Sequence, residues 1–256
     1  MLYQTLLNTR SHVDFIKLDN VSKMFQNLTV LKKVSMEIHK GEFIGILGPS
    51  GCGKSTLLTL LSGLEKISSG VLHNNSTKGK SAFVFQDSCL MPWKTLEQNI
   101  AIPLEILNLS RQEIEEKVNK YLKILDLYKF RKNYPRELSG GMKMRASIAR
   151  ALVTDPEVIL MDEPFASLDQ ILRERLVDEI YEIYLRKNLT GIFVTHNIAE
   201  AVFLCNRIYI FSFHPGQIIG QIQINKSNMD MKKYRNSDVF HQTCVKIRTI
   251  LENSNE

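Results

Sequence analysis

The chain has 256 residues, of which 44% are hydrophobic and 23% are charged, a composition typical of a soluble protein with one large domain or one domain and a subdomain. Its 33 basic and 27 acidic residues give a mild net charge of +6 and are scattered rather than clustered. This charge allows a nucleic-acid partner or an anionic membrane surface but demands neither, and an ordinary solvated surface explains it best.

The cysteines and the apolar stretches exclude two further classes of protein. The longest stretch without a charged residue, 208–225, contains Pro215, Gly216 and Gly220, which indicates strand, turn and strand rather than a membrane span. Residues 1–20 show no apolar core followed by a cleavage site, so we expect any membrane association to come through a partner. The cysteines lack metal-ligand spacing and CxxC pairs, which predicts reduced thiols of a cytosolic protein; they are Cys52, Cys89, Cys205 and Cys244.

The first part of the chain, from Phe15 to Ile46, is rich in short β-type patterns. Val34, Met36 and Ile38 alternate with polar residues, which predicts a half-exposed strand. The apolar run from Phe43 to Leu47 predicts a buried strand that ends at a glycine.

A glycine-rich loop follows this strand and fits the pattern G-x-x-x-x-G-K-[ST]. Its residues are Gly48, Pro49, Ser50, Gly51, Cys52, Gly53, Lys54, Ser55 and Thr56. The glycines let several N–H groups point at one anion, and the helix predicted from Thr56 to Leu64 adds its positive end. Lys54 would contact the β- and γ-phosphates and the Ser55 hydroxyl would ligate Mg²⁺. The strand before and the helix after disfavour an ordinary turn, and Cys52 is interpreted as a tolerated small side chain rather than a reactive thiol.

A mostly helical insertion follows a short buried strand at Ala82 to Phe85. Ser110 and Glu113 form a predicted capping box at the start of one helix. The apolar residues behind this cap fall on one helical face; they are Ile114, Val118, Tyr121, Leu122 and Leu125.

Two adjacent carboxylates, Asp162 and Glu163, come directly after the apolar strand Glu157 to Met161. Ligands bind at this edge of open α/β sheets. Asp162 would hold the hydration shell of Mg²⁺, and Glu163 would orient or deprotonate an attacking water. A solvated acidic turn is the alternative, and the phosphate loop elsewhere in the chain makes it the weaker one.

The remaining strands and helices alternate along the chain. Gly191 to Thr195 is a fourth buried strand, with predicted helices at Gln170 to Lys187 and Asn197 to Phe203 on either side. This alternation predicts an α/β fold with a mainly parallel sheet that is covered on both faces. The end of the chain is charged and polar, with a helix predicted around Val239 to Leu251.

A second candidate anion site starts the helix Lys143 to Leu152: Leu138-Ser139-Gly140-Gly141-Met142 places a serine and two glycines at its tip. One chain does not need two such tips for one nucleotide, whereas two chains packed head to tail would.

From about Phe15 to Gln223 the sequence resembles the nucleotide-binding subunits of ABC (ATP-binding cassette) transporters. The motifs occur in the order of that family. They are Phe25 at the aromatic position for adenine, the P-loop Gly48 to Thr56, Gln86 of the Q-loop, the signature Leu138 to Met142, Asp162 and Glu163 of Walker B, Ser167-Leu168-Asp169 of the D-loop and the switch histidine His196.

The resemblance implies a P-loop NTPase cassette with a mainly parallel core sheet, an N-terminal antiparallel β part and a helical subdomain. We expect an ATPase domain at 1–225, a helical subdomain at about 87–153 and a polar, helical tail at 226–256. Two copies would sandwich two MgATP, each held by the P-loop of one chain and by Ser139, Gly140 and Gly141 of the other.

The resemblance also implies a role for each motif residue. Glu163, His196, Lys54 and Gln86 would be catalytic, and Ser55, Gln86 and Asp162 would contact Mg²⁺. Alternatives stay open for single residues: Phe25 as a core aromatic, Gln86 as a surface amide, His196 as a buried hydrogen-bonded histidine, and Asp169 as a helix N-cap, a role that is compatible with the D-loop. Met142, Met144 and Asn197 depart from common residues of the family but remove no group that the chemistry requires.

The stretch Val84 to Trp93 more narrowly resembles the importer branch for nitrate, sulfonates and taurine, as do the signature and His214 to Ile218. Leu90, Met91 and Trp93 would suit a groove for a helix of a membrane permease, with subdomain core as the alternative. We therefore expect a subunit on the cytoplasmic face of the membrane with a second copy, permease subunits and, indirectly, a solute-binding protein as partners, and no nucleic acid.

Two other functions are weighed against transport. A non-transport ABC ATPase acting on ribosomes or DNA would favour two fused cassettes or a long coiled-coil insertion, and neither is present. A regulatory cassette that binds ATP without turnover conflicts with intact Lys54, Glu163 and His196.

Overall fold

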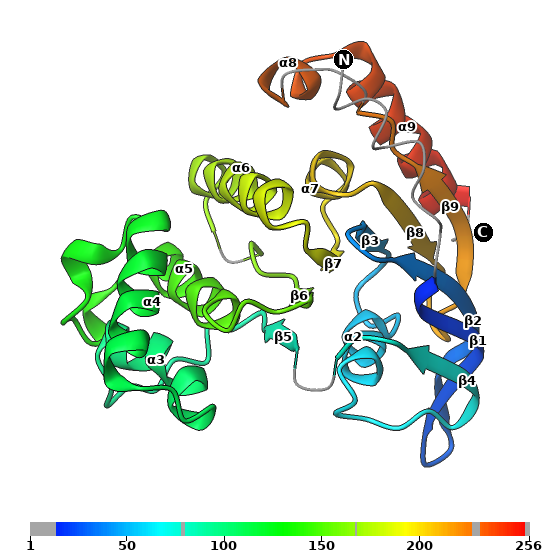
Figure 1. The fold of residues 1–256 in the computed structure, drawn as a ribbon. Helices are drawn as coiled ribbons and strands as arrows, with labels where there is room; N and C mark the ends of the chain where they lie inside the picture. Colours follow the sequence, from blue (N-terminus) through cyan, green and yellow to red (C-terminus); the bar gives the residue numbers. More distant parts are fainter. Residues whose placement is uncertain (1–13, 78–79, 167, 227–230, 254–256) are drawn as a thin grey trace, which may run out of the picture.

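The computed structural model describes residues 14–77, 80–166, 168–226 and 231–253. Ser167, which the sequence assigns to the D-loop, lies outside them. Figure 1 shows one sheet in the middle of the molecule, a second, antiparallel sheet on one side and a group of helices on the other.

The main sheet has six strands in the order β5-β6-β7-β3-β8-β9. Five of them are parallel, and β9 pairs with β8 in the antiparallel direction. Their bounds are β3 Phe43–Leu47, β5 Ser81–Val84, β6 Val158–Asp162, β7 Thr190–Thr195, β8 Arg207–Phe211 and β9 Ile218–Gln223. The mainly parallel core sheet that the sequence predicts is therefore confirmed.

The second sheet is antiparallel, with the order β2-β1-β4. It consists of β1 Asp14–Phe25, β2 Leu28–His39 and β4 Ser69–Asn74. β4 is missing from the sequence prediction because five of its six residues are exposed, which leaves no apolar alternation to detect. The N-terminal antiparallel β part is confirmed.

The helices cover both faces of the main sheet. Their bounds are α2 Lys54–Leu61, α3 Leu96–Ile106, α4 Arg111–Ile124, α5 Gly140–Leu152, α6 Gln170–Lys187, α7 Ile198–Leu204, α8 Met231–Arg235 and α9 Asp238–Asn253, with short 3₁₀ turns η1 Tyr128–Phe130 and η2 Pro135–Glu137. α2 begins two residues earlier than predicted and ends before Gly63, whose φ is +76°. α5 begins at Gly140 rather than Lys143, since Ser139 caps it.

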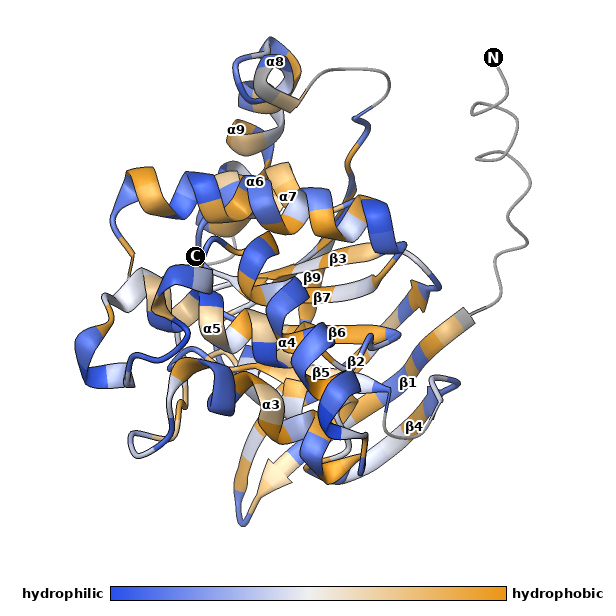
Figure 2. Ribbon diagram, turned by 60° about the vertical axis from the view of Figure 1, so that its left-hand side comes forward, coloured by the Kyte–Doolittle hydropathy of each residue, from blue (hydrophilic) through white to orange (hydrophobic). Residues whose placement is uncertain are grey.

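The core consists of two layers on the two faces of the main sheet. Alternate residues of β3 show this division: Ile44 and Ile46 pack with α2 and the antiparallel sheet, whereas Phe43 and Leu47 pack with the other helices. All five residues of β3 are buried, as expected for a central parallel strand with both faces covered. Figure 2 shows apolar residues concentrated on these central strands.

The C-terminal segment 231–253 packs against the core, and the helix predicted around Val239 to Leu251 is α9. α9 contacts α7, β8 and β9, and Tyr234, Phe240 and Ile247 are buried. Arg235 pairs with Glu174 (3.3 Å) and Asp178 (2.7 Å) of α6. The charged composition of this segment concealed a regular apolar face that anchors it to the core.

Candidate functional site: a phosphate cradle beside two carboxylates

The glycine-rich loop at 48–56 connects β3 to α2, as the sequence predicts. Gly51 and Gly53 have φ of +78° and +96°, a region that other L-residues adopt only at a cost. Gly53 is the N-cap of α2, so the loop delivers its backbone N–H groups at the positive end of that helix. This arrangement is a cradle for an anion.

Lys54 is the first residue of α2 and is buried beneath this loop. Its side chain is 5% exposed, and its Nζ donates to the carbonyls of Gly48 (2.9 Å) and Pro49 (2.7 Å). The same nitrogen is 3.7 Å from Oε1 of Glu163. The ammonium is thus held on the inner side of the loop, next to the carboxylates that follow β6.

Asp162 ends β6 beside the start of α2. Its carboxylate is hydrogen-bonded to Ser55, and burial raises its pKa above the usual value, helped by the negative charge of Glu163. Oδ1 of Asp162 is buried and has no protein hydrogen-bond partner. A buried carboxylate oxygen without a donor, beside a serine hydroxyl, fits the oxygen ligands that Mg²⁺ takes.

Glu163 follows with an unusual backbone. Its φ is +44°, a left-handed conformation that is uncommon for residues other than glycine, asparagine and aspartate. Its N–H donates to the Val194 carbonyl (2.9 Å), which fixes the turn to β7. The turn aims the side chain at Lys54 on one side and at Nδ1 of His196 on the other, 2.8 Å from Oε2.

His196 is not a buried histidine, because its side chain is 59% exposed. It follows β7 directly, and among the described residues its hydrogen-bond partner is Glu163. The alternative of an internal histidine is therefore wrong, and the ring keeps one nitrogen free to face a ligand.

Phe25, at the tip of the β1–β2 hairpin, is 42% exposed, so it is not a core aromatic. Nζ of Lys23 lies 4.4 Å from the centre of its ring, and that ammonium is held by Glu65 (2.8 Å) and the Lys66 carbonyl (2.9 Å). The ring therefore has a cation beside it and keeps apolar surface available for stacking.

Gly216, which the sequence analysis did not assign to the site, joins this hairpin to the cradle. Its N–H donates to the Val30 carbonyl (2.8 Å), and its carbonyl accepts from the Lys32 N–H (3.0 Å). A Cβ at this position would lie 2.0 Å from the carbonyl oxygen of Cys52. Only a glycine therefore permits this close contact of three backbone segments.

Cys52 itself is fully buried. Burial raises the pKa of its thiol, and the opposing effect of Lys54 is smaller. Low exposure and a raised pKa are the reverse of what a reactive cysteine needs. The interpretation as a tolerated small side chain stands.

The structure does not bring the signature segment 138–142 to the cradle. α5, which starts at Gly140, and α2 lie on different sides of the central strands (Figure 1). Ser139 caps α5 by accepting from the Met142 N–H (3.3 Å), while Gly141 packs so closely on α6 that a Cβ would lie 2.1 Å from Cδ2 of Leu172. Ser139 and Gly140 are exposed, so this tip is available to a molecule outside the chain.

Asp169 caps α6, accepting from the Leu172 N–H (3.0 Å). Gln86 is exposed and is the second residue after β5. Trp93 is 71% exposed, so the alternative of subdomain core is wrong for it. Leu90 is half-buried against the core, and Met91 is exposed.

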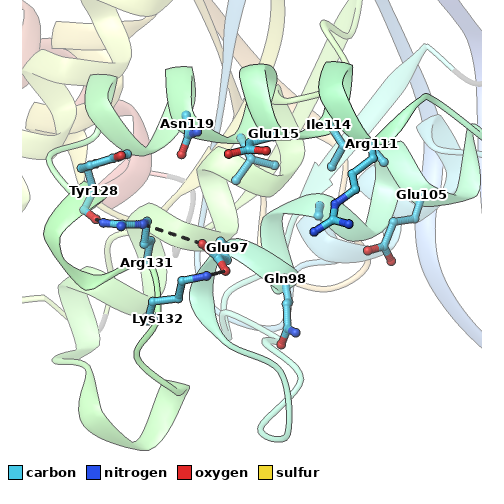
Figure 3. A pocket seen from close by; sticks show the side chains of 12 residues that line it. Glu97, Gln98, Glu105, Arg111, Ile114, Glu115, Asn119, Tyr128, Arg131 and Lys132 are labelled. Atoms are coloured by element: carbon cyan, nitrogen blue, oxygen red, sulfur yellow. Dashed lines mark hydrogen bonds and ion pairs between the residues drawn. The ribbon is translucent and has the colours of Figure 1, made fainter.

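A separate hollow of about 370 Å³ lies between α3 and α4 (Figure 3). Its charged side chains are partly paired with each other, as Lys132 and Arg131 are with Glu97 (2.6 and 4.0 Å). It contains none of the predicted site residues. The chemistry is therefore concentrated at the carboxyl ends of β3, β6 and β7.

None of the helices within the described ranges combines the length and the apolar character that crossing a membrane requires.

The parallel sheet with its phosphate cradle, lysine and paired carboxylates defines a P-loop ATPase. Residues 31–166, more than half of the chain, match the profile of the family described as "ABC transporter". The chain belongs to this family and is an ATP-binding, ATP-hydrolysing cassette.

Two known proteins are similar in sequence to this chain over most of its length. The aliphatic sulfonates import ATP-binding protein SsuB of Bacillus thuringiensis is 39% identical over 241 residues, which cover 91% of this chain and 94% of the relative. The spermidine/putrescine import ATP-binding protein PotA of Thermotoga maritima is 41% identical over 212 residues, covering 80% of this chain and 57% of the relative.

A solved structure has the same fold. The ATP-binding cassette MJ0796, determined as a dimer in a post-hydrolysis state bound to ADP and phosphate, superimposes with a TM-score of 0.72 at 31% identity. The match covers 82% of this chain and 99% of that cassette.

Proposed function

We propose that this chain is the ATP-hydrolysing subunit of a membrane importer for a small solute, of the nitrate, sulfonate and taurine type or related to it. Both relatives reported above are named as import ATP-binding proteins, which favours an importer over an ATPase that acts on ribosomes or DNA. The observation that carries the mechanism is the separation of two anion sites, the cradle at 48–56 and the exposed tip at Ser139 and Gly140, which belong to different elements.

The cradle would hold the triphosphate. Lys54 would neutralise charge on the β- and γ-phosphates, and Phe25 would stack on adenine. Ser55, Asp162 and Gln86 would hold Mg²⁺, which, when bound, neutralises charge that develops on the phosphate oxygens. The free Oδ1 of Asp162 supports this assignment.

Glu163 would act on the attacking water. Its hydrogen bond to His196 and its proximity to Lys54 orient the carboxylate before any substrate arrives. A positioned base of this kind typically contributes about 10²–10⁴-fold to a rate. The exposed ring nitrogen of His196 would contact the γ-phosphate.

A second copy would complete the site. In a head-to-tail pair, the tip of one chain at Ser139, Gly140 and Gly141 would face the cradle of the other, and Asp169 would lie at the contact. Closure would exclude all water but the nucleophile, and loss of the γ-phosphate would weaken the contact.

The permease would dock on the helical part of the chain, which we take as a subdomain at about 87–153 within an ATPase domain at 1–225. Trp93 and Met91, both exposed, would contact a helix of the permease at the cytoplasmic face of the membrane. A solute-binding protein would act through the permease and would select the solute.

Two variants test this function. Glu163→Gln should abolish turnover while retaining ATP and trapping a dimer, because only the base is lost; size-exclusion chromatography with ATP measures the dimer. Lys54→Ala should lose binding or turnover, measured by retention of labelled ATP. A Glu163→Gln protein with normal ATPase activity refutes the role of Glu163.

The transport function has its own test. Purification of the tagged chain from membranes should recover integral membrane subunits, and detergent-solubilised complexes should hydrolyse ATP. Recovery of ribosomes or DNA in their place would refute an importer.

A further inference from the structure

Two loops that precede different helices are connected to the candidate catalytic residue Glu163, one along the chain and the other through a hydrogen bond. One, at 168–169, precedes α6 and contains Asp169, which is proposed to lie at the dimer contact. The other, at 195–197, precedes α7 and contains His196, which binds Glu163 (2.8 Å). A rigid connection between these loops would link the position of Asp169 at the proposed dimer contact to the position of Glu163, the proposed base.

Glu200, in the first turn of α7, holds the loop around His196 on both sides. Its Oε2 accepts from the Thr195 hydroxyl (2.7 Å), and its backbone N–H donates to Oδ1 of Asn197 (3.2 Å). Thr195 in turn accepts from the Asn197 N–H (3.0 Å). The side chain of Glu200 is only 8% exposed, and buried carboxylates are rare unless they are paired.

The partner of this carboxylate is Arg173 in the first turn of α6. Nε of Arg173 lies 3.5 Å from Oε1 of Glu200, and a terminal nitrogen of the guanidinium donates to the Leu168 carbonyl (2.8 Å). One residue therefore contacts the loop before α6 directly and the loop before α7 through Glu200. Burial raises the pKa of Glu200, and its hydrogen bond from Thr195 and the positive charge of Arg173 oppose that effect.

We propose that Glu200 and Arg173 are positioning residues that fix the His196 loop to the Asp169 loop and so hold Glu163 in register with the dimer contact. The proposal rests on the proposed function, since it takes Glu163 as the base. Neither residue touches the nucleotide in this arrangement, and both act through the loops. Because the alignment of the base matters only during reaction, its loss lowers kcat rather than the affinity for ATP.

The neutral variant Glu200→Gln keeps the acceptor for Thr195 and removes the charge that pairs with Arg173. We expect kcat to fall by about tenfold or more with KM for ATP changed by less than about twofold. Arg173→Lys should be intermediate, because a lysine keeps the charge but not the fork that reaches two partners. An unchanged kcat in Glu200→Gln, or a rise in KM alone, overturns the proposal.

A cavity beside the pair allows a rescue experiment. It measures about 580 Å³ and is lined by both Arg173 and Glu200, together with Arg235, Asn236, Phe240 and His241 of the C-terminal segment. Guanidinium ion therefore has space to replace the missing group in Arg173→Ala. At roughly 10–50 mM, far below denaturing concentrations, it should restore activity severalfold.

The matched control is an exposed pair on the same helix, Glu182 and Arg186 (2.8 Å). Glu182→Gln and Arg186→Ala should leave kcat unchanged and show no guanidinium effect, since exposed pairs contribute little. A folded Arg173→Ala protein, verified by its melting temperature, that guanidinium does not rescue overturns the proposal. A wild-type chain without ATPase activity would instead refute the proposed function.

Discussion

Asp162 and Glu163 are neighbours in the chain, yet their carboxylates have different surroundings. Asp162 is hydrogen-bonded to Ser55 and leaves Oδ1 without a partner, whereas both oxygens of Glu163 face positively charged or hydrogen-bonding groups. The two residues diverge because β6 ends at Asp162 and the left-handed turn at Glu163 redirects the chain. Different surroundings suit different roles, a metal ligand and a base.

Asp162→Asn should make the nucleotide-free protein more stable at neutral pH. The folded-state pKa of Asp162 is raised, so the folded chain binds a proton more tightly than the unfolded chain does. The resulting stability is present at low pH and is lost as pH rises through the folded-state pKa. Removing the charge should therefore raise the free energy of unfolding at pH 7, measured by thermal or urea denaturation.

The same variant should respond weakly to MgATP. Wild-type protein should gain melting temperature on adding MgATP, because binding stabilises the folded state, and Asp162→Asn should lose most of that gain. A variant that is less stable than wild type without nucleotide, or that responds fully to MgATP, would contradict the reasoning for Asp162.

Sequence motifs predicted which residues form the candidate site, but they did not predict how exposed each side chain is. The P-loop, Asp162, Glu163 and His196 converge at one sheet edge because the carboxyl ends of parallel strands do so. Exposure was not predictable: His196 and Trp93 each had a plausible buried alternative, and only the packing of the whole chain decides it. Glu200 could have been noticed, since Asn197-x-x-Glu200 is the spacing of a capping box.

At the scale of elements, the loop between β8 and β9 links the β1–β2 hairpin to the loop at 48–56. Gly216 bridges Val30 and Lys32 of β2 and lies against the backbone of Cys52. This contact sets the distance between Phe25, which is proposed to bind adenine, and the loop that is proposed to bind phosphate. The affinity for ATP depends on both parts of the site being held at the correct distance from each other.

Gly216→Ala should therefore weaken ATP binding. The added methyl would require a backbone to move, because its nearest atom is the Cys52 carbonyl at 2.0 Å. We expect an increase in Kd of about tenfold, measured by calorimetric titration of the folded variant. Gly220→Ala is the control, since its Cβ would lie 3.4 Å from the nearest atom. Equal Kd values for Gly216→Ala and wild type would refute this linkage.

Elements with strong periodicity were predicted closely, and weakly patterned ones were not. The capping box at Ser110 and Glu113 starts α4 as expected, because its chemistry is local. β4 has almost no buried residue, so its place beside β1 depends on partners that are distant in sequence. The C-terminal helix was predicted around Val239 to Leu251 and is α9. The packing of the C-terminal segment against the core was not predicted for the same reason, since Arg235 reaches Asp178 across the chain.

At the scale of the whole molecule, the loop at 48–56 and the exposed tip at Ser139 and Gly140 are two candidate anion sites that do not meet within one chain. The cradle and the exposed tip of α5 lie on different elements, separated by the central strands (Figure 1). A single copy would therefore be inactive, and the ATPase activity would depend on the fraction of chains that form a dimer, which rises with protein concentration. Steady-state ATPase activity of the isolated chain should rise more steeply than linearly with protein concentration.

Trp93 provides a direct probe of permease docking. It is the only tryptophan of the chain and is largely exposed, so its emission reports on one surface. Binding to the permease in detergent or nanodiscs should shift the emission to shorter wavelength and reduce quenching by acrylamide, as the indole leaves water. ATP without permease should leave quenching nearly unchanged.

Trp93→Ala tests the same surface energetically. It should weaken association with the permease by about 2 kcal/mol if the indole is an anchor, while ATP binding by the isolated chain stays normal. Met24→Ala, which removes an exposed apolar side chain on β1, is the control and should retain association. Unshifted emission on assembly of a functional transporter would exclude Trp93 from the contact.

The backbone at Glu163 has a consequence for natural and engineered variants. Holding a glutamate at φ +44° costs the folded chain about 1 kcal/mol, whereas asparagine accepts this conformation more readily. Glu163→Asn should therefore melt at a higher temperature than the native enzyme and yet be inert. Selection for thermal stability alone would therefore favour inactive variants at this position. Only selection for ATP hydrolysis explains why a glutamate is retained at this turn.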